Sequence, residues 1–386
     1  MLNSNVVSEL SKNEPEWLDK IRRNALETFE KLPLPYFKYG IAISNDLSNF
    51  NLDSLNPLEL QDVEIISEGA EVLLFEDALK KYPKVLQSFF SSVEFDKNKF
   101  TSLHGAFFNQ TLLVVVPKNT KAKVKINLKL KTTLIQNLII VAEENSELEF
   151  IETLNSVSKD FRSQFIKVIA KRGAKIRYFT LQDFADNVNN FVERKADLRA
   201  DSSLVWVDYL LGSKLTKLNS SNELNGQGAS AKTIGAFLGE NKQSFDLYIE
   251  SVHNSRDTYS DILTHGTLTD ESKSIYRGLI KIKNGAKNSR GYQKESTLLL
   301  SDKVKADAVP KLEIYEKEVK CSHGTAIGRL DDEKLFYLMA RGLDEKSAKT
   351  QLIKAFFEPI ESQLKNKEAV SKLKVAISKK LERAVK

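Results

Sequence analysis

The sequence predicts a mainly β protein in which one long β region lies between two helical regions. From about Thr101 onwards apolar residues recur with a period of two, most plainly in Val124–Leu130, where apolar and polar residues alternate strictly. No proline interrupts the chain between Pro117 and Pro310. On both sides of this region apolar residues recur every three to four positions, as in amphipathic helices. We therefore expect an N-terminal mainly helical region at 1–100, a β core at 101–325 and a C-terminal helical subdomain at 326–386.

Two helical segments are predicted before the β core. The first runs from Glu14 to about Lys31, where apolar residues fall on one helical face, and Pro33 stops it. The second spans residues 72–93 and is divided by Pro83 into two short helices. The stretch 40–56 is rich in Asn, Ser and Asp and lacks either period, so we expect it at the surface.

Short turn clusters punctuate the β core at intervals of roughly 25 to 29 residues, the spacing of a structural repeat. These clusters are Pro117–Thr120, Glu143–Ser146, Lys171–Ala174, Ala200–Ser203 and Asn225–Gly228. The candidate strands, besides 124–130, are Leu148–Ile151, Lys175–Phe179, Leu204–Tyr209, Phe245–Ile249 and Gly278–Lys283. Both a stacked β-solenoid and a sandwich with regular turns fit this spacing, and the residues alone leave the two open.

The chain becomes helical again after Leu330. Asp331 or Asp332 can cap a helix, and Gly342 suits the position just after its end. A second helix starts at Asp344, with Ala348, Leu352 and Phe356 predicted as its buried stripe and Pro359 as its end or kink. A last basic amphipathic helix is expected from Ala369. Such helices can touch membranes or acidic partners, but we favour packing on its own domain.

Composition narrows the possible functions. The 58 Lys and Arg residues against 52 Asp and Glu residues leave a net charge of +6, with both signs mixed along the chain, so nucleic acid is not an expected partner. No segment reaches the ~18 apolar residues of a membrane span, and the N-terminus does not resemble a signal peptide. A single cysteine excludes an internal disulfide framework. We expect a cytoplasmic protein.

The sequence lacks the common catalytic signatures. It has no phosphate loop of the G-x-x-x-x-G-K-[ST] type, no G-x-S-x-G elbow and no H-E-x-x-H motif. ATP hydrolysis by this chain alone is therefore not expected, and we predict a non-catalytic protein. Two histidines, His104 and His265, are expected to be exposed or satisfied by neighbours. His253 lies in a strand-like region, and its role stays open between structure and function.

Cys321 and His323 form the one soft-ligand pair. In an extended chain their side chains project from the same face about 7 Å apart along the strand. Iron–sulfur and zinc centres need three or four ligands, and one cysteine cannot supply them. If the pair binds a metal, carboxylates, sulfide or another subunit must complete the site, which would then lie at an interface. The alternative for Cys321 is a small buried thiol.

The segment Cys321–Leu338, with Arg341-Gly342 after it, resembles the C-terminal signature of the SufB/SufD family of iron–sulfur cluster assembly proteins. The family form is C-S-H-G-A-T-x-G followed by L-F-Y-L-x-S-R-G; here Thr325-Ala326 inverts one pair and Ala340 replaces the serine. Leu298–Ser301 and Pro310–Ile314 are similar to the family's LLLS…P-x-LEI segment. Asn13–Leu18, with Leu32–Pro35, resembles an N-terminal motif that is more typical of the SufB branch.

Two departures place the resemblance on the SufD-like branch. The SufB-like segment D-K-C-G-A-H-T-x-P is matched by 302–310, where Val304 stands at the cysteine and Asp307 at the histidine. SufB-like chains also read H-E-A-T where this chain has Gly324 after His323. The resemblance therefore implies an assisting subunit that does not nucleate a cluster alone.

The resemblance also implies an architecture and partners. It implies a right-handed parallel β-helix core with helical subdomains at both ends, pairing with a SufB-like subunit or forming a homodimer. It further implies a SufC-like ABC-type ATPase bound by the C-terminal helices, for which the candidate contacts are Leu335, Phe336, Tyr337, Arg341, Leu352 and Phe356. His323, and less strongly Cys321, would contribute to a transient iron–sulfur cluster shared with the partner. Binding of a reduced flavin stays open.

Two other functions remain as alternatives. A β-helical carbohydrate-active enzyme would need carboxylates in register along one face, and these do not recur here. A structural β-solenoid that binds partners through its ends needs no metal chemistry. Co-purification with an ATPase is expected of an iron–sulfur cluster assembly subunit, but of neither alternative.

Overall fold

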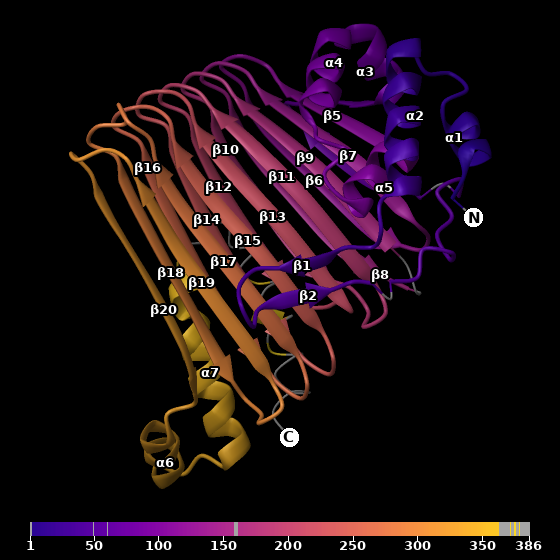
Figure 1. The fold of residues 1–386 in the computed structure, drawn as a ribbon. Helices are drawn as coiled ribbons and strands as arrows, with labels where there is room; N and C mark the ends of the chain where they lie inside the picture. Colours follow the sequence, from indigo (N-terminus) through magenta and orange to yellow (C-terminus); the bar gives the residue numbers. More distant parts are fainter. Residues whose placement is uncertain are drawn as a thin grey trace.

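The computed structural model describes residues 2–48, 50–59, 61–157 and 161–362, together with 371, 374, 375 and 378. The helix expected from Ala369 falls almost entirely outside these residues. Most of the described chain forms one parallel β-helix, with α1–α5 at one end and α6 and α7 at the other (Figure 1). The β-helix predicted from the family resemblance is confirmed, and the sandwich alternative is wrong.

Sixteen strands, β5 to β20, alternate between two sheets, so each successive pair of strands makes one of eight coils. Within each sheet these strands are parallel. Strand β3 pairs antiparallel with β6, and β4 pairs antiparallel with β5, so each sheet has nine strands. The strands of the first sheet are β3 Val63–Glu68, β6 Lys121–Leu130, β8 Glu147–Ser156, β10 Lys175–Asp183, β12 Ser203–Leu210, β14 Ser230–Gly239, β16 Tyr259–Leu268, β18 Arg290–Leu299 and β20 Lys320–Arg329. Those of the second are β4 Glu71–Leu74, β5 Gln110–Val116, β7 Leu134–Ala142, β9 Phe161–Ala170, β11 Asn189–Leu198, β13 Leu215–Leu224, β15 Ser244–His253, β17 Lys273–Ile282 and β19 Lys305–Ile314.

The turn clusters set the length of each coil. Each of the first seven coils has a residue in a left-handed conformation at the same corner: Asn119, Asn145, Gly173, Asp201, Gly228, Asp257 and Asn288. Asn, Asp and Gly tolerate this conformation best, which explains why these residue types recur there. A β carbon on Gly173 would lie 2.3 Å from Asn145 Oδ1, so a larger residue in this coil would displace the Asn145 side chain. The predicted repeat is confirmed, and the register shows coils of 26 residues (Lys121 to Glu147) lengthening to 31 (Tyr259 to Arg290).

The core of the β-helix lies between the two sheets. In β6 every second side chain, such as Val124 and Ile126, points inward and is buried, while the lysines between them point outward. This interior also holds polar side chains in bonded groups. Arg194 forms two hydrogen bonds of 2.8 and 2.6 Å with the Asp208 carboxylate, and its guanidinium lies 4.1 Å from the Trp206 ring centre. The interior is therefore filled by packed apolar side chains and by polar side chains that form hydrogen bonds and ion pairs with each other.

The N-terminal segment covers the outer face of the second sheet. Its helices are α1 Ser4–Leu10, α2 Glu16–Lys31, α3 Phe75–Lys81, α4 Pro83–Ser92 and α5 Lys99–Phe107. The helix predicted from Glu14 and the division of the second helical segment at Pro83 are confirmed. A short hairpin, β1 Tyr36–Lys38 and β2 Ser44–Asp46, crosses the same sheet (Figure 1). This hairpin, β3 and β4 were not predicted from the sequence.

The C-terminal segment forms two helices, α6 Asp332–Ala340 and α7 Glu345–Glu361. Asp331 and Asp344 cap them, and Gly342 lies between them with φ +96°, as predicted. Helix α7 packs on the outer face of the first sheet. One detail of its prediction is wrong. Its buried face is formed by Ala348, Ile353, Phe357 and Ile360, so Leu352 and Phe356 lie beside the buried stripe. Of the two alternatives predicted for Pro359, an end is excluded, because the helix continues to Glu361.

Candidate functional site at the open end of the β-helix

In the described part of the chain, no helix or strand covers the last coil of the β-helix. Strand β20 pairs only with β18, and β19 pairs only with β17, so each is the edge strand of its sheet. Most side chains of β20 are exposed, and those of β19 are at most half-buried. An edge strand presents unpaired N–H and C=O groups that another chain can pair with. This open end is consequently the part of the β-helix best suited to association.

Strand β20 carries Cys321 and His323 side by side on its inward face. Cys321 is in register with Gly291 and His323 with Gln293, and both of these β18 residues are buried. Because side chains alternate along a strand, Cys321 and His323 share this face, as predicted. Their surroundings differ: Cys321 is half-buried against the interior apolar cluster, whereas His323 is exposed.

Burial raises the pKa of the Cys321 thiol above its ordinary value. The thiol is then protonated at neutral pH, and a protonated thiol is a poor metal ligand and nucleophile. The exposed imidazole of His323 is open to an approaching ligand or partner. Of the two residues, His323 is thus the better placed to bind metal, and Cys321 also has a packing role.

Two polar side chains lie in the interior directly beneath this pair. The amide nitrogen and oxygen of Gln293 and one carboxylate oxygen of Glu295 have no hydrogen-bond partner in the described part of the chain. Burial raises the pKa of Glu295 to about 7, and Thr297 donates a hydrogen bond to its other oxygen. The register places Glu295 opposite Thr325, two residues along the strands from Gln293 and His323 and on the same face. Neither residue was predicted from the sequence, because only the register brings them next to β20.

A shallow hollow of about 360 Å³ runs along β18 and β20 beside His323. It is lined by Asp261, Tyr292 and Lys294 and by small residues of β20 such as Gly324 and Ala326. Among the described residues, no group of three or more His, Cys, Asp and Glu side chains lies close enough to hold a metal ion. A cluster at this end would need ligands from outside the described chain.

The other three histidines have structural partners. His104 is buried between Ser163 Oγ at 2.7 Å and Asn137 Oδ1 at 3.0 Å, and burial lowers its pKa to about 3. His253 lies inside the β-helix with its ring nitrogens 2.7 and 2.8 Å from the hydroxyls of Thr258 and Ser260, and burial lowers its pKa to about 4. The prediction that neighbouring side chains bond to His104 is confirmed. His253, whose role was left open, is a hydrogen-bonded residue of the interior.

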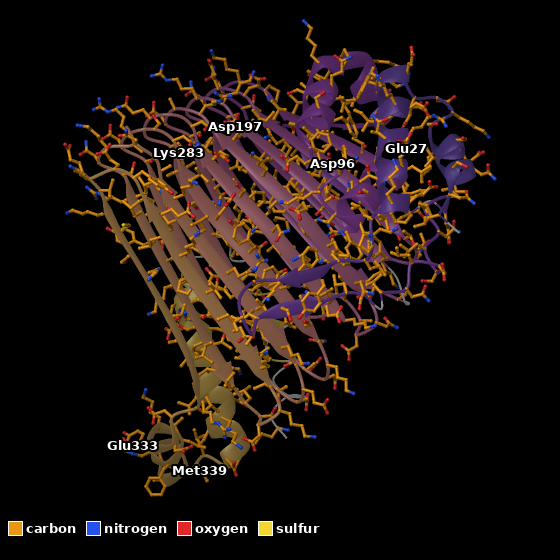
Figure 2. The ribbon with its side chains drawn as sticks, in the orientation of Figure 1. Glu27, Asp96, Asp197, Lys283, Glu333 and Met339 are labelled. Atoms are coloured by element: carbon orange, nitrogen blue, oxygen red, sulfur yellow. The ribbon has the colours of Figure 1, made fainter. Side chains whose placement is uncertain are left out.

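Helix α6 is the most exposed apolar element near the open end. None of its residues is buried, and Phe336 and Tyr337 are 73% and 57% exposed. The Arg341 guanidinium lies 5.2 Å from the Tyr337 ring centre, and Leu335 is half-buried. Figure 2 shows Glu333 and Met339 on this helix, away from the strands. Apolar side chains gathered on an exposed helix indicate a protein-binding surface.

Helix α7 contributes less accessible surface. His265 lies 2.7 Å from the Phe356 carbonyl oxygen, and the two rings stack 4.6 Å apart, which anchors α7 to β16. Leu352 is half-buried. Of the predicted partner contacts, Phe336 and Tyr337 on α6 and Arg341 directly after it are exposed, and Leu335 is half-buried. Leu352 and Phe356 lie where α7 packs on the sheet.

Comparison with known proteins agrees with this architecture. The family described as "SUF system FeS cluster assembly, SufBD core domain" matches residues 99–356. Iron–sulfur cluster assembly SufBD family proteins of Staphylococcus aureus strains MRSA252 and USA300 are each 26% identical to this chain, over 96% of its length and 91% of theirs. A protein of the same description from Staphylococcus haemolyticus shows the same identity and coverage. Within the described residues, no helix is long and apolar enough to cross a membrane.

Proposed function

The chain belongs to the SufBD family of the SUF iron–sulfur cluster assembly system, and we propose that it is a SufD-like subunit that assists a SufB-like scaffold. Val304 and Gly324 stand where the SufB-like motifs have a cysteine and a glutamate. The chain then offers a single thiol, and burial keeps that thiol protonated. A subunit with this donor set contributes ligands to a cluster and does not hold one alone.

The open end of the β-helix is the proposed meeting point with the SufB-like subunit. The observation that carries this proposal is the pair of uncovered edge strands, β19 and β20, with His323 exposed on the inward face of β20. Pairing there would bring His323 next to the donors of the other subunit. The nascent cluster, or its iron, is the cargo held between them, and His323 is the favoured ligand from this chain.

Helix α6 is the proposed contact for a SufC-like ABC-type ATPase. It exposes apolar side chains directly after β20, and Asp331 at its N-terminus is separated from Arg329 by one residue. A movement of α6 driven by ATP binding would therefore be transmitted to the strand that carries His323. In this hypothesis the movement opens the subunit interface and gives the cluster ligands access to iron and sulfur.

Co-expression of the chain with SufB-like and SufC-like proteins tests the assignment. We expect a complex of all three chains. Replacing Ile327, which is 42% exposed on the inward face of β20, by lysine places a charge at the open edge and should prevent pairing with the SufB-like chain. Leu58→Lys is the matched control, because Leu58 is 43% exposed in the N-terminal segment.

Absence of a complex would contradict the assignment. So would an Ile327→Lys chain that pairs as well as the Leu58→Lys control. A stable homodimer that excludes the SufB-like chain would contradict the heterodimer and favour a homodimeric assembly protein.

A further inference from the structure

A group of polar side chains lies inside the β-helix, directly beneath its last coil. Thr264 is on β16, Tyr276 on β17, and Gln293 and Glu295 on β18. Each of the four is at most 3% exposed. Because β18 pairs with the edge strand β20, these residues lie one strand away from the open end. Together they form what we call the inner polar layer.

The register brings the members of this layer together. Thr264 and Glu295 are in register on β16 and β18, and such neighbouring strands lie about 4.8 Å apart (Figure 1). His265, the next residue of β16, contacts α7 on the outer face, so Thr264 faces the interior. Burial and the nearby Glu295 charge raise the pKa of Tyr276 above its ordinary value. The Tyr276 phenol therefore faces the Glu295 carboxylate from the opposite sheet.

Gln293 crosses the interior from β18 to β17. A β carbon on Gly278 would lie 2.1 Å from Gln293 Nε2 and 2.6 Å from its Oε1, so the amide rests against the backbone of β17. Gly278 is two residues from Tyr276, and both are buried on the same face of this strand. The glycine thus leaves room for an amide beside the phenol, and a larger residue would displace it.

Five polar atoms of the inner polar layer have no hydrogen-bond partner in the described part of the chain. They are Thr264 Oγ1, Tyr276 Oη, Gln293 Nε2 and Oε1, and Glu295 Oε2. Buried polar atoms nearly always have a partner, because an atom left without one keeps the full cost of its desolvation. Five such atoms within neighbouring coils indicate a bound group among them.

The chemistry of these atoms selects a small monovalent cation. Four of the five are oxygens, the ligands that hard cations prefer. Glu295 is the one carboxylate of the layer, so a single positive charge neutralises it, whereas a divalent ion would leave a net charge in the interior. A proton on Glu295 does not replace the ion, because Oε2 or the proton on it would still lack a partner. The remaining atom, Gln293 Nε2, can donate to a water molecule bound to the ion.

We propose that the inner polar layer binds a sodium or potassium ion, with Glu295 as its charged ligand and Thr264, Tyr276 and Gln293 as neutral oxygen ligands. The ion joins the two sheets in the coil on which β20 rests, beneath His323. The proposal does not depend on the SufD-like role, because it concerns the chain without partners. Failure of the complex with SufB-like and SufC-like proteins would leave it unchanged.

Thermal unfolding of the full chain in three chloride salts at equal ionic strength tests the proposal. Sodium and potassium chloride are compared with tetramethylammonium chloride, whose cation is too large for the buried layer. At about 0.2 M, sodium or potassium should raise the melting temperature by at least about 2 °C relative to tetramethylammonium. The salt with the larger effect identifies the ion, and a crystal structure in that salt should show it bonded to Glu295.

Two variants remove ligands while keeping the size of the side chain. Glu295→Gln removes the charge and should abolish the ion-specific rise in melting temperature, and Tyr276→Phe removes one hydroxyl and should reduce it. Tyr209→Phe is the matched control. The Tyr209 hydroxyl is also buried without a partner among the described residues, but it lies on the outer face of the first sheet, in the apolar cluster that includes α7. This variant should keep the wild-type rise.

The proposal is overturned if neither salt stabilises the chain more than tetramethylammonium chloride, or if the crystal structure shows only water in the layer. It is also overturned if Glu295→Gln keeps the wild-type rise, or if Tyr209→Phe loses as much of it as Tyr276→Phe. Should Glu295→Gln fail to fold, the comparison of Tyr276→Phe with Tyr209→Phe decides.

Discussion

Replacing Phe336 by alanine should separate partner binding from folding. Phe336 is 73% exposed on α6, so a partner that covers it removes most of the ring from water. A phenylalanine side chain presents about 200 Å², of which roughly 150 Å² is then available for burial in the complex. At about 25 cal/mol per Å², this area corresponds to a binding free energy of about 3.8 kcal/mol. The dissociation constant for the ATPase should rise by roughly 500-fold, because 1.4 kcal/mol is tenfold.

The same substitution should change the stability of the isolated chain by less than about 1 kcal/mol, as is usual for surface positions. Phe357 on α7 gives the opposite case. It is fully buried against the first sheet, and its replacement by alanine should destabilise the fold by about 3–5 kcal/mol. Tyr36→Ala, at a residue 59% exposed on β1, controls for the loss of an exposed aromatic ring far from α6.

Calorimetric titration with the SufC-like ATPase measures binding, and denaturant unfolding of each variant measures stability. Binding of Phe336→Ala at the wild-type affinity would refute the assignment of α6. Equal weakening by Tyr36→Ala would refute it as well, since the loss would then not be specific to α6.

Three further substitutions test the physical account of the fold. Arg194→Ala leaves the Asp208 carboxylate buried without its partner and should lower the free energy of unfolding by about 3–5 kcal/mol in urea; a change below about 1 kcal/mol would show that the pair contributes little. Because burial lowers the pKa of His104 to about 3, below its ordinary value of 6.5, its stabilising contribution is complete above pH 6.5 and is lost as the pH falls toward 3. This residue should account for a loss of about 1.4 kcal/mol per pH unit, and His104→Gln should show a correspondingly flatter dependence of the unfolding free energy on pH. Gly173→Ala should lower the melting temperature more than Gly285→Ala: both glycines have positive φ, but a β carbon meets a neighbouring atom only at Gly173. Equal effects would mean that the corner stack imposes no steric limit.

The sequence predicted strands well only where one face of the sheet is exposed. In β6 the outward lysines alternate with buried residues, so the period of two is plain. In β7 every side chain is buried, because the N-terminal helices cover its outer face, and no alternation remains in the sequence. The coil length could be predicted because turn residues with positive φ recur at one corner.

The buried face of α7 was predicted only in part. Ala348 was expected and is buried, but Ile353 and Phe357 take the places assigned to Leu352 and Phe356. Several apolar residues are adjacent in this helix, so more than one stripe satisfies the helical period. The packing against β14 and β16 selects between these stripes, and that packing cannot be inferred from the local pattern.

Only the part of the candidate site that lies within a single strand was predicted. The alternation within β20 placed Cys321 and His323 on the same face. Gln293 and Glu295 could not be connected with them, since they lie 30 residues earlier and meet β20 only through the register. A cleft over the second sheet, lined among others by Phe37, Lys195 and Tyr248, also escaped prediction, because its residues come from five strands, the hairpin, α4, α5 and the loop between these helices.

The iron and acid-labile sulfide content of the complete complex tests the central claim most directly. The chain is co-expressed with its SufB-like and SufC-like partners as wild type, His323→Ala or Cys321→Ser, and the purified complexes are analysed. We predict that His323→Ala keeps all three chains together but loses most of its iron and sulfide, while Cys321→Ser loses less. A His323→Ala complex with wild-type iron and sulfide would contradict the proposed role of the open end of the β-helix.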